Sequence, residues 1–244
     1  MRKYLPHILI ISFVFLLAPS GCNISKFNLK IDKLQSEVRK NPDDAEVHYN
    51  LGYAYGESGK YEEAIESYKQ AIRINPDYAA AHNNLGAAYY ESGRYEEAIE
   101  SFKQTIRIDP DFAMAHNNLG LAYYNTGKYQ EAIESYKQAI RIDPDFAWAH
   151  NNLSLAYYES GKYEEAIKSC KQAIRIDPDF AMAHYNLGNA YGESGKQQEA
   201  IESYRQAIRI GPDFAWAHNN LGYTYAELGK YEEAIESYKQ AIEI

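Results

Sequence analysis

Six histidines recur at intervals of 34 residues, and imidazoles in such a row could bind a metal ion or respond to pH near neutrality. They are His48, His82, His116, His150, His184 and His218. Equivalent atoms on neighbouring stacked helices lie about 10 Å apart, which is too far for two imidazoles to share one metal ion. We therefore expect packing residues copied by duplication, with no metal site and no cofactor.

A second polar row lies two residues further along each repeat. It consists of Asn50, Asn84, Asn118, Asn152, Asn186 and Asn220. Because an amide is both donor and acceptor, it can pair with an extended peptide backbone whatever the peptide's sequence. The four inner members, Asn84, Asn118, Asn152 and Asn186, are predicted peptide contacts. The alternative is that these amides hold neighbouring repeats together.

The repeats differ most at a few positions, and these positions can distinguish one stretch of a binding surface from another. The second position holds Glu46, Ala80, Met114, Trp148, Met182 and Trp216, and the twelfth holds Gly56, Tyr90, Tyr124, Tyr158, Gly192 and Ala226. Aromatic and methionine side chains are good anchors for a partner. We predict contacts at Met114, Trp148, Tyr90, Tyr124 and Tyr158, with Glu91 and Glu159 at the edge. Alternatively, Met114 and Trp148 pack between repeats.

Enzyme and nucleic-acid functions find no support in the sequence. There is no G-x-S-x-G, no H-E-x-x-H and no P-loop, and each glutamate lies in a repeated slot that reads as a solvated helix face. The formal charge is -9, and the basic residues stand singly among more numerous acidic ones, so a phosphate backbone would be repelled. We expect a protein or peptide partner and no nucleic acid.

The elements that position these residues are pairs of helices, as the third repeat shows. Apolar residues recur at helical spacing from Ala115 to Tyr123 and again from Tyr129 to Ile140. Gly127 between the two stretches indicates a helix C-terminus. Pro144 breaks the chain after the second helix, and Asp145 is predicted to cap the next one. Such a pair cannot bury its apolar face alone, so the repeats must stack on one another.

The repeat resembles the tetratricopeptide repeat. In the third repeat the signature is carried by Leu119, Gly120, Tyr123, Ala132, Tyr136, Ala139 and Pro144. The departures are Ser154 for glycine, Thr105 for alanine and Gln197 for tyrosine. The resemblance implies an all-α fold, an alpha-solenoid of six helix-turn-helix units in a right-handed superhelix. It also implies that the first helices line a concave groove that binds peptides or partner proteins.

The N-terminus reads as an export signal. Arg2 and Lys3 precede an apolar run over 7–18, which is too short for a comfortable membrane span. The Ser-Gly-Cys ending at Cys22 resembles the lipobox of bacterial lipoproteins, in which the cysteine is lipidated, although Pro19 departs from that pattern. Ordinary cleavage or an uncleaved anchor are the alternatives. All three place the repeats outside the cytoplasm, in the cell envelope, with membrane contact only through this segment.

The expected organisation is a signal over 1–22, an amphipathic half-repeat over 23–44, and six units. The units are 45–78, 79–112, 113–146, 147–180, 181–214 and 215–244. The half-repeat is expected to cover the apolar end of the first unit through Phe27, Ile31, Leu34 and Val38. The sixth unit stops without its closing proline, so self-association through that end is a further expectation. Two functional alternatives rest on resemblance alone: pilotin-like assembly lipoproteins, and the repeat arm of protein O-linked N-acetylglucosamine transferases.

Overall fold

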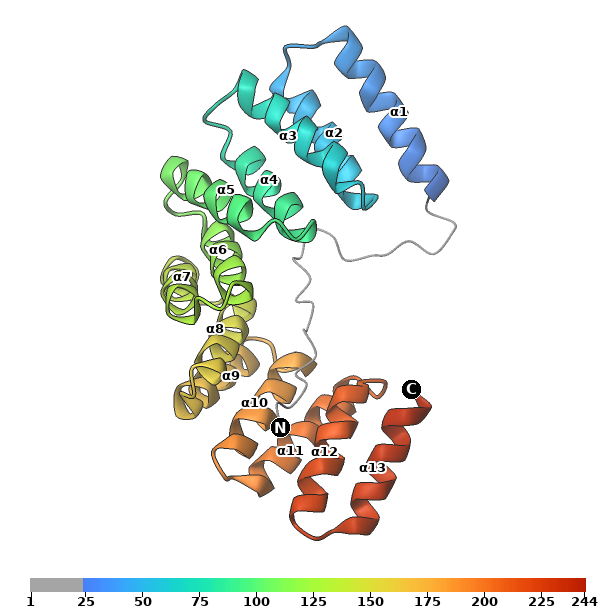
Figure 1. The fold of residues 1–244 in the computed structure, drawn as a ribbon, viewed down its shortest axis with the longest axis vertical. Coiled ribbons are helices and arrows are strands. Elements are labelled where there is room, and N and C mark those ends of the chain that lie inside the picture. Colours follow the sequence, from blue (N-terminus) through green and yellow to red (C-terminus); the bar gives the residue numbers. More distant parts are fainter. Residues whose placement is uncertain (1–23) are drawn as a thin grey trace. The chain divides into compact units, whose positions relative to one another are not determined.

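The structure, a computed structural model, describes residues 24–244, with side chains from residue 28 onwards. The residues fall into two compact units, one up to Ala122 and one from Tyr123 onwards. All regular structure in the described range is helical (Figure 1). The helices are α1 (Ile24–Lys40), α2 (Ala45–Glu57), α3 (Tyr61–Ile74), α4 (Ala79–Glu91), α5 (Tyr95–Ile108), α6 (Ala113–Asn125), α7 (Tyr129–Ile142), α8 (Ala147–Glu159), α9 (Tyr163–Ile176), α10 (Ala181–Glu193), α11 (Gln197–Ile210), α12 (Ala215–Glu227) and α13 (Tyr231–Glu243).

A tight turn joins the two helices of each repeat, and glycine makes it. In the third repeat Gly127 has a φ of 74°, in the left-handed region that only glycine enters without strain. Two backbone bonds close the turn, from Gly127 N–H to the Tyr124 carbonyl at 3.0 Å and from Lys128 N–H to the Tyr123 carbonyl at 2.9 Å. Carbonyls at the end of α6 are thereby satisfied. The predicted helix end at Gly127 is confirmed.

The predicted cap at Asp145 is wrong. Helix α8 begins after Phe146, and no side chain caps it. The backbone N–H of Asp145 instead donates to the Asp143 carboxylate at 3.1 Å, so the acidic residues shape the connecting turn. A histidine fastens the same turn, because His150 Nε2 lies 3.0 Å from the Pro144 carbonyl oxygen. The sequence pattern located the turn correctly, and it assigned the N-terminal cap of α8 to the wrong residue.

Each second helix packs closely on the first helix of its own repeat because the first helix carries a glycine there. A Cβ atom built on Gly188 would lie 2.5 Å from the ring of Tyr204. The fourth repeat departs from this pattern at both partners, with Ser154 in the glycine position and Cys170 in the aromatic position. Both side chains are fully buried, and the Ser154 hydroxyl donates to the Asn151 carbonyl at 2.6 Å. A larger first-helix residue is thus matched by a smaller second-helix residue.

Helix α1 packs against α2, in the way that a second helix packs against the first helix of the next repeat (Figure 1). Ile31 is buried with Leu51 and Ala54, and Leu34 and Val38 pack against this cluster. The fourth residue of the predicted apolar face, Phe27, lies outside the described side chains. The second unit ends differently, since Ile235 of α13 is 54% exposed while the equivalent Ile133 of α7 is 1% exposed.

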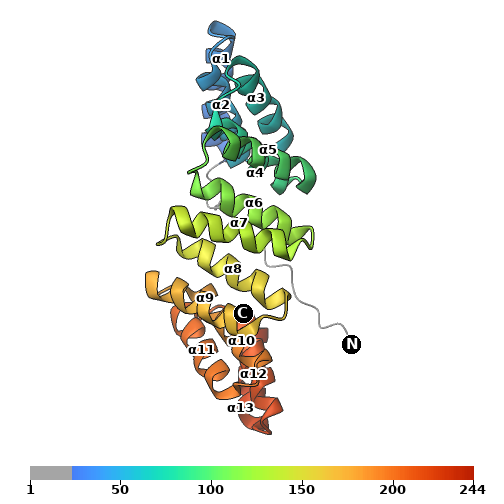
Figure 2. The same cartoon turned by 90° about the vertical axis from the view of Figure 1, so that its left-hand side faces the viewer.

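The fold class is therefore the predicted all-α solenoid of helix-turn-helix repeats, seen in each unit as helices stacked in chain order (Figures 1 and 2). Among residues 24–244, no helix is both long enough and apolar enough to cross a membrane.

Candidate peptide-binding site

The first helices of successive repeats form the tighter side of each stack. In the second unit α8 contacts α10 and α10 contacts α12, and in the first unit α2 contacts α4. Within the described residues of either unit, no second helix contacts another second helix. Helices that touch along one side and spread apart along the other curve towards the touching side. The inner, concave side of each stack is therefore lined by first-helix side chains that point away from the second helices. We call this surface the first-helix face.

The four predicted asparagines are buried between these helices. Asn84, Asn118, Asn152 and Asn186 are 6%, 5%, 1% and 4% exposed. Three of their amide nitrogens donate to the preceding first helix: Asn84 to the Tyr49 hydroxyl at 3.1 Å, Asn118 to Asn83 Oδ1 at 3.3 Å, and Asn186 to Asn151 Oδ1 at 2.9 Å. The structure thus uses these amides to join neighbouring repeats. Their role as peptide contacts stays a prediction, and the proposal below does not depend on it.

The predicted tyrosines at the twelfth position remain partly exposed, and each is held by a second aromatic ring. Tyr124 lies with its ring centroid 5.5 Å from that of Tyr129, and Tyr158 lies 5.6 Å from Tyr163. In the first unit Tyr90 has the same relation to Tyr95, at 5.3 Å. The partner ring opens the second helix, five residues later, just after the glycine turn. We call Tyr124 and Tyr158, which both lie in the second unit, the tyrosine stripe.

The supporting rings Tyr95, Tyr129 and Tyr163 were not predicted from the sequence. The signal was present, because a tyrosine at the twelfth position and another at the seventeenth flank the turn glycine in the second, third and fourth repeats. The fifth repeat loses both, with Gly192 and Gln197 in their places. Pairing fixes the rings with little remaining rotamer freedom, and a fixed aromatic surface costs less entropy when it binds a partner.

A carboxylate lies directly beside the stripe. The Tyr124 hydroxyl donates to Glu159 Oε1 at 3.5 Å, so a tyrosine of α6 reaches a glutamate of α8. Burial raises the pKa of Glu159, and the hydrogen bond from Tyr124 partly opposes that rise. Burial also raises the pKa of Tyr124, with the Glu159 charge adding to the effect, so the hydroxyl stays protonated and remains a donor.

The carboxylates continue along the first helices at the thirteenth position. Their members are Glu57, Glu91, Glu159, Glu193 and Glu227, and Asn125 stands at the same position in the third repeat. Burial raises the pKa of Tyr158, and the charges of Glu193 and Glu159 raise it further. Aromatic rings and negative charge are therefore interleaved on the first-helix face of the second unit.

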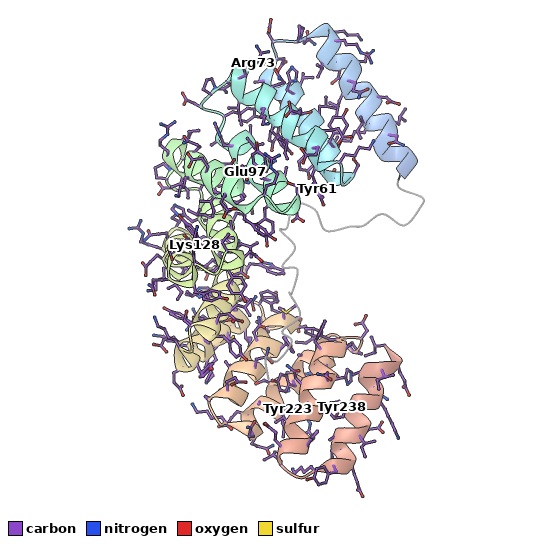
Figure 3. The ribbon with its side chains drawn as sticks, viewed as in Figure 1. Tyr61, Arg73, Glu97, Lys128, Tyr223 and Tyr238 are labelled. Atoms are coloured by element: carbon purple, nitrogen blue, oxygen red, sulfur yellow. The ribbon has the colours of Figure 1, made fainter. Side chains whose placement is uncertain are left out.

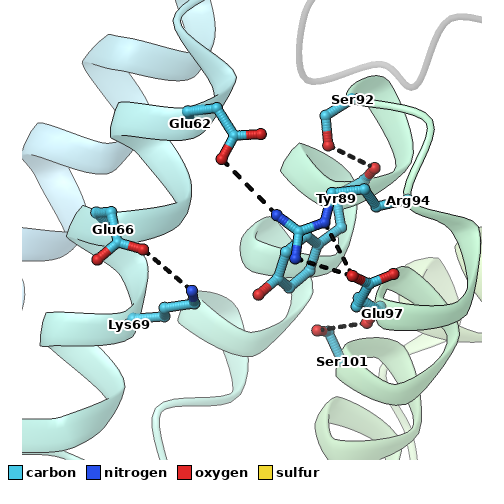
Figure 4. A network of polar contacts seen from close by, with 8 residues as sticks. All are labelled: Glu62, Glu66, Lys69, Tyr89, Ser92, Arg94, Glu97 and Ser101. Atoms are coloured by element: carbon cyan, nitrogen blue, oxygen red, sulfur yellow. Dashed lines mark hydrogen bonds and ion pairs between the residues drawn. The ribbon is translucent and has the colours of Figure 1, made fainter.

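On the second helices several acidic residues have cationic partners. Arg94 lies 2.8 Å from Glu97 and 3.7 Å from Glu62, and Lys69 lies 3.0 Å from Glu66 (Figure 4). The hydrogen bond from Arg94 is the main cause that lowers the pKa of Glu97. Glu159 on the first-helix face is paired with a hydroxyl instead. The first-helix face thus holds a half-buried carboxylate that makes no ion pair within the described residues.

Trp148 takes part in packing between repeats. Its ring lies 4.6 Å from that of Phe180, at a tilt of 57°, and it packs on a buried cluster with Ala173 and Ala183. Met114 is half-buried at the start of α6. Lys128 directly precedes α7 (Figure 3), and its ammonium group lies 5.9 Å from the centre of the Tyr123 ring. Among the predicted anchors, the tyrosine stripe is the set whose side chains are partly exposed and lie beside a carboxylate, that of Glu159.

The histidines fasten turns. In every repeat Nε2 lies 2.9 or 3.0 Å from the carbonyl oxygen of the proline six residues earlier. Over the described part of the chain, no three His, Cys, Asp or Glu side chains are grouped as metal ligands would be. Cys170 is buried, which raises the pKa of its thiol to about 12. Cys22, the predicted lipidation site, lies outside the described residues.

A family model described as the cilia and flagella-associated protein 70 C-terminal domain matches residues 25–244. No curated protein sequence matches the chain. Among solved structures, MamA is 29% identical with a TM-score of 0.62, and the match covers 68% of this chain and 96% of that one.

Two further solved structures show the fold alone. YrrB, whose title describes a TPR protein with an unusual peptide-binding site, is 22% identical with a TM-score of 0.61, over 75% of this chain and 95% of that one. A chain of the APC/C hetero-tetramer Cut9–Hcn1 is 18% identical with a TM-score of 0.73. That match covers 89% of this chain and 43% of the longer one.

Proposed function

Because the chain belongs to the family of the cilia and flagella-associated protein 70 C-terminal domain, a tetratricopeptide-repeat family that binds proteins, we propose that it holds an extended, basic and partly apolar segment of a partner on its first-helix face. Repeat domains of this kind are typically non-catalytic. The observation that carries the proposal is the tyrosine stripe beside Glu159, where two ring pairs and a half-buried carboxylate lie on the inner side of one unit.

The partner chemistry follows from what that surface lacks. The carboxylate of Glu159 has been partly removed from water, which raises its pKa, and its hydrogen-bond partner is a neutral hydroxyl. A Lys or Arg side chain placed there would restore the lost solvation with a charge-assisted bond. The neighbouring rings of Tyr124 and Tyr158 would contact the aliphatic stem and the apolar residues beside it.

An extended segment also fits the spacing of the repeats. Neighbouring first helices pack about 8–10 Å apart, and an extended chain advances about 3.3 Å per residue. A bound segment would therefore place every third residue over a new repeat. The two carboxylates of α8 and α10, Glu159 and Glu193, would then be reached by basic residues three apart in the partner.

The test is a selection followed by a matched charge removal. Peptides of twelve random residues, displayed on phage, are selected on the chain, and the best is labelled and measured by fluorescence anisotropy. We expect basic peptides, and binding weakened about tenfold in the double variant Glu159→Gln/Glu193→Gln, which corresponds to about 1.4 kcal/mol. The control Glu165→Gln/Glu199→Gln removes the same charge from the second helices of the same repeats.

Equal weakening by both double variants would mean that net charge alone attracts the peptide. Selection of acidic peptides, or of none that the Glu159→Gln/Glu193→Gln variant affects, would contradict the assignment of the site. Circular dichroism on each variant keeps the comparison between folded proteins.

We further propose that the chain is exported and lipidated at Cys22, which rests on the sequence of residues 1–22. The intact mass of protein extracted from membranes would exceed that of the cleaved polypeptide by a diacylglycerol unit, and Cys22→Ala would abolish the increase. An unmodified mass in the parent would contradict lipidation.

A further inference from the structure

A groove opens on the outer side of the first unit, between α1 and α3 and above α2. It has a volume of about 660 Å³. Its apolar part is formed by Val38, Leu51 and Tyr55, and its wall by Glu62, Glu63 and Glu66. Gln35 and Arg39 of α1 and Ser67 of α3 complete the lining. We call this surface the N-terminal groove, and it is separate from the first-helix face.

The later repeats show which kind of side chain belongs above such a tyrosine. Each tyrosine equivalent to Tyr55 has a basic residue twenty positions earlier, on the preceding second helix. Lys69 lies 5.9 Å above the Tyr89 ring, and Lys171 lies 5.5 Å above the Tyr191 ring. At the next junction, between α11 and α12, Arg205 donates to the hydroxyl of Tyr225 at 2.6 Å.

The first junction departs from this rule. Gln35 occupies the position of the lysine or arginine, and its Nε2 donates to the Tyr55 hydroxyl at 2.7 Å. An amide side chain is shorter than lysine and carries no charge. The tyrosine therefore keeps its hydrogen bond, while a cation that the other junctions supply is missing from the groove.

The charges around the groove favour a cation. Glu66 is paired with Lys69 at 3.0 Å, and Glu62 lies 3.7 Å from Arg94 (Figure 4). Glu63 makes no ion pair within the described part of the chain, although its backbone carbonyl accepts from Ser67 at 2.9 Å. Arg39 is the one cation in the lining, and its Nε donates back to the Gln35 carbonyl at 3.3 Å. Two of the three carboxylates in the lining therefore have cationic partners from outside it, and Glu63 is the one that makes no ion pair within the described residues.

We propose that the N-terminal groove binds a Lys or Arg side chain of a partner polypeptide. The cationic head would lie at Glu63 and Glu66, and the aliphatic stem over Tyr55, Val38 and Leu51. The partner would supply in trans the cation that the other junctions supply from the preceding helix. An apolar floor with a carboxylate wall matches the shape of a lysine or arginine side chain, which buries its stem and keeps its charge hydrated.

A substitution taken from the repeat itself tests the proposal. Gln35→Lys places in the groove the residue that the first four repeats carry at this position, and it should block the site without disturbing the helix. The probes are N-acetyl-lysine amide and N-acetyl-arginine amide, followed through the methyl NMR signals of Val38 and Leu51 in the full chain. N-acetyl-norleucine amide, which has a lysine-like stem and no charge, is the control probe.

We expect saturable shifts with both cationic probes in the parent, and an apparent Kd at least tenfold higher in Gln35→Lys. Gln240→Lys, which adds the same charge on α13, should bind as the parent does. Glu63→Gln should weaken binding several-fold. Equal binding of the norleucine probe, unchanged binding in Gln35→Lys, or the absence of saturable shifts in the parent would each overturn the proposal. Glu159→Gln/Glu193→Gln should leave this binding unchanged, which separates it from the first-helix face.

Discussion

Two helices of the molecule perform the same packing task in different surroundings. Helix α9 packs on α10 through Ile167, Cys170 and Ile174, and α1 packs on α2 through residues at the equivalent positions, Ile31, Leu34 and Val38. On its other side α9 meets α8, its own first helix, whereas α1 has no such partner among the described residues. Helix α1 therefore keeps the apolar residues that contact the following helix, and it differs from α9 at positions on its other side.

The changed positions show the adaptation. Ala166 and Ala173 of α9 are fully buried, and their counterparts on α1 are Lys30 and Glu37. Lys30 lies 3.4 Å from Glu57, and Glu37 lies 3.9 Å from Lys33. Departures from the repeat are therefore informative. In α1, charged residues replace an apolar face. In the fourth repeat, a larger first-helix residue, Ser154, is matched by a smaller second-helix residue, Cys170. At the first junction, the cation above Tyr55 is missing.

The largest expected effect on the free energy of unfolding distinguishes α9, which packs against a helix on each side, from α1, which within the described range packs only against α2. Ile167→Ala removes a buried side chain from the second unit and should lower the free energy of unfolding by about 2–5 kcal/mol. Ile31→Ala removes an equally buried side chain, yet it should chiefly free α1, because one junction alone holds that helix. Urea unfolding and amide hydrogen exchange distinguish the two.

If Ile31→Ala lowers the unfolding midpoint as much as Ile167→Ala, the two helices are equally integrated and the contrast fails. Ile242→Ala is a matched control, since that isoleucine is 83% exposed and its loss should change stability by less than about 0.5 kcal/mol.

The size exchange in the fourth repeat should be reversible only as a pair. Cys170→Tyr brings a ring against Ser154, and in the fifth repeat a Cβ at the glycine position would lie 2.5 Å from such a ring. We expect a loss of about 1–3 kcal/mol from overpacking. Ser154→Gly added to Cys170→Tyr should recover most of it. Additive effects in this double-mutant cycle would show that the two positions are independent.

The buried asparagines should affect stability before they affect binding. Asn186→Ala removes the donor to Asn151 and leaves a buried acceptor unsatisfied, at a cost of about 1–3 kcal/mol. Asn50→Ala, at the equivalent position of the first repeat where the asparagine is exposed, should change the free energy of unfolding by less than about 0.5 kcal/mol. Thermal unfolding of the two variants gives the comparison, and an Asn186→Ala variant as stable as the parent would restore the amide row as a candidate ligand contact.

The smallest effect is a pH dependence. Because burial raises the pKa of Glu159 above its usual value near 4.5, the protonated form is favoured by folding. The stability it contributes is fully present below pH 4.5 and is lost as the pH rises through the raised pKa. Parent stability should therefore fall, relative to Glu159→Gln, over the range just above pH 4.5. Parallel urea midpoints of the two proteins across that range would show that the carboxyl is not desolvated.

Much of the fold could be predicted, because the residues that end the helices recur with the 34-residue period. Gly127 and Pro144 mark the turns, and the apolar spacing marks both helices. The cap was mispredicted because Asp143 and Asp145 are both good turn formers, and only the backbone geometry shows which one accepts a bond. Local pattern locates a turn more reliably than it assigns a hydrogen bond within it.

The site was less predictable. Period alone places Asn118 and Tyr124 on the same helix, and it does not show that the asparagine is turned inwards to Asn83 while the tyrosine stays partly exposed. That difference depends on how closely neighbouring first helices approach. The bond from Tyr124 to Glu159 joins residues 35 apart, and only the stacked arrangement brings them together.

The most direct measurement of the central claim is amide hydrogen exchange of the chain with and without a selected basic peptide. Protection should appear at the ends of α8 and α10 near Glu159 and Glu193, and α9 and α11 should be unchanged. Protection of α9 and α11 with α8 and α10 unchanged would contradict binding on the first-helix face.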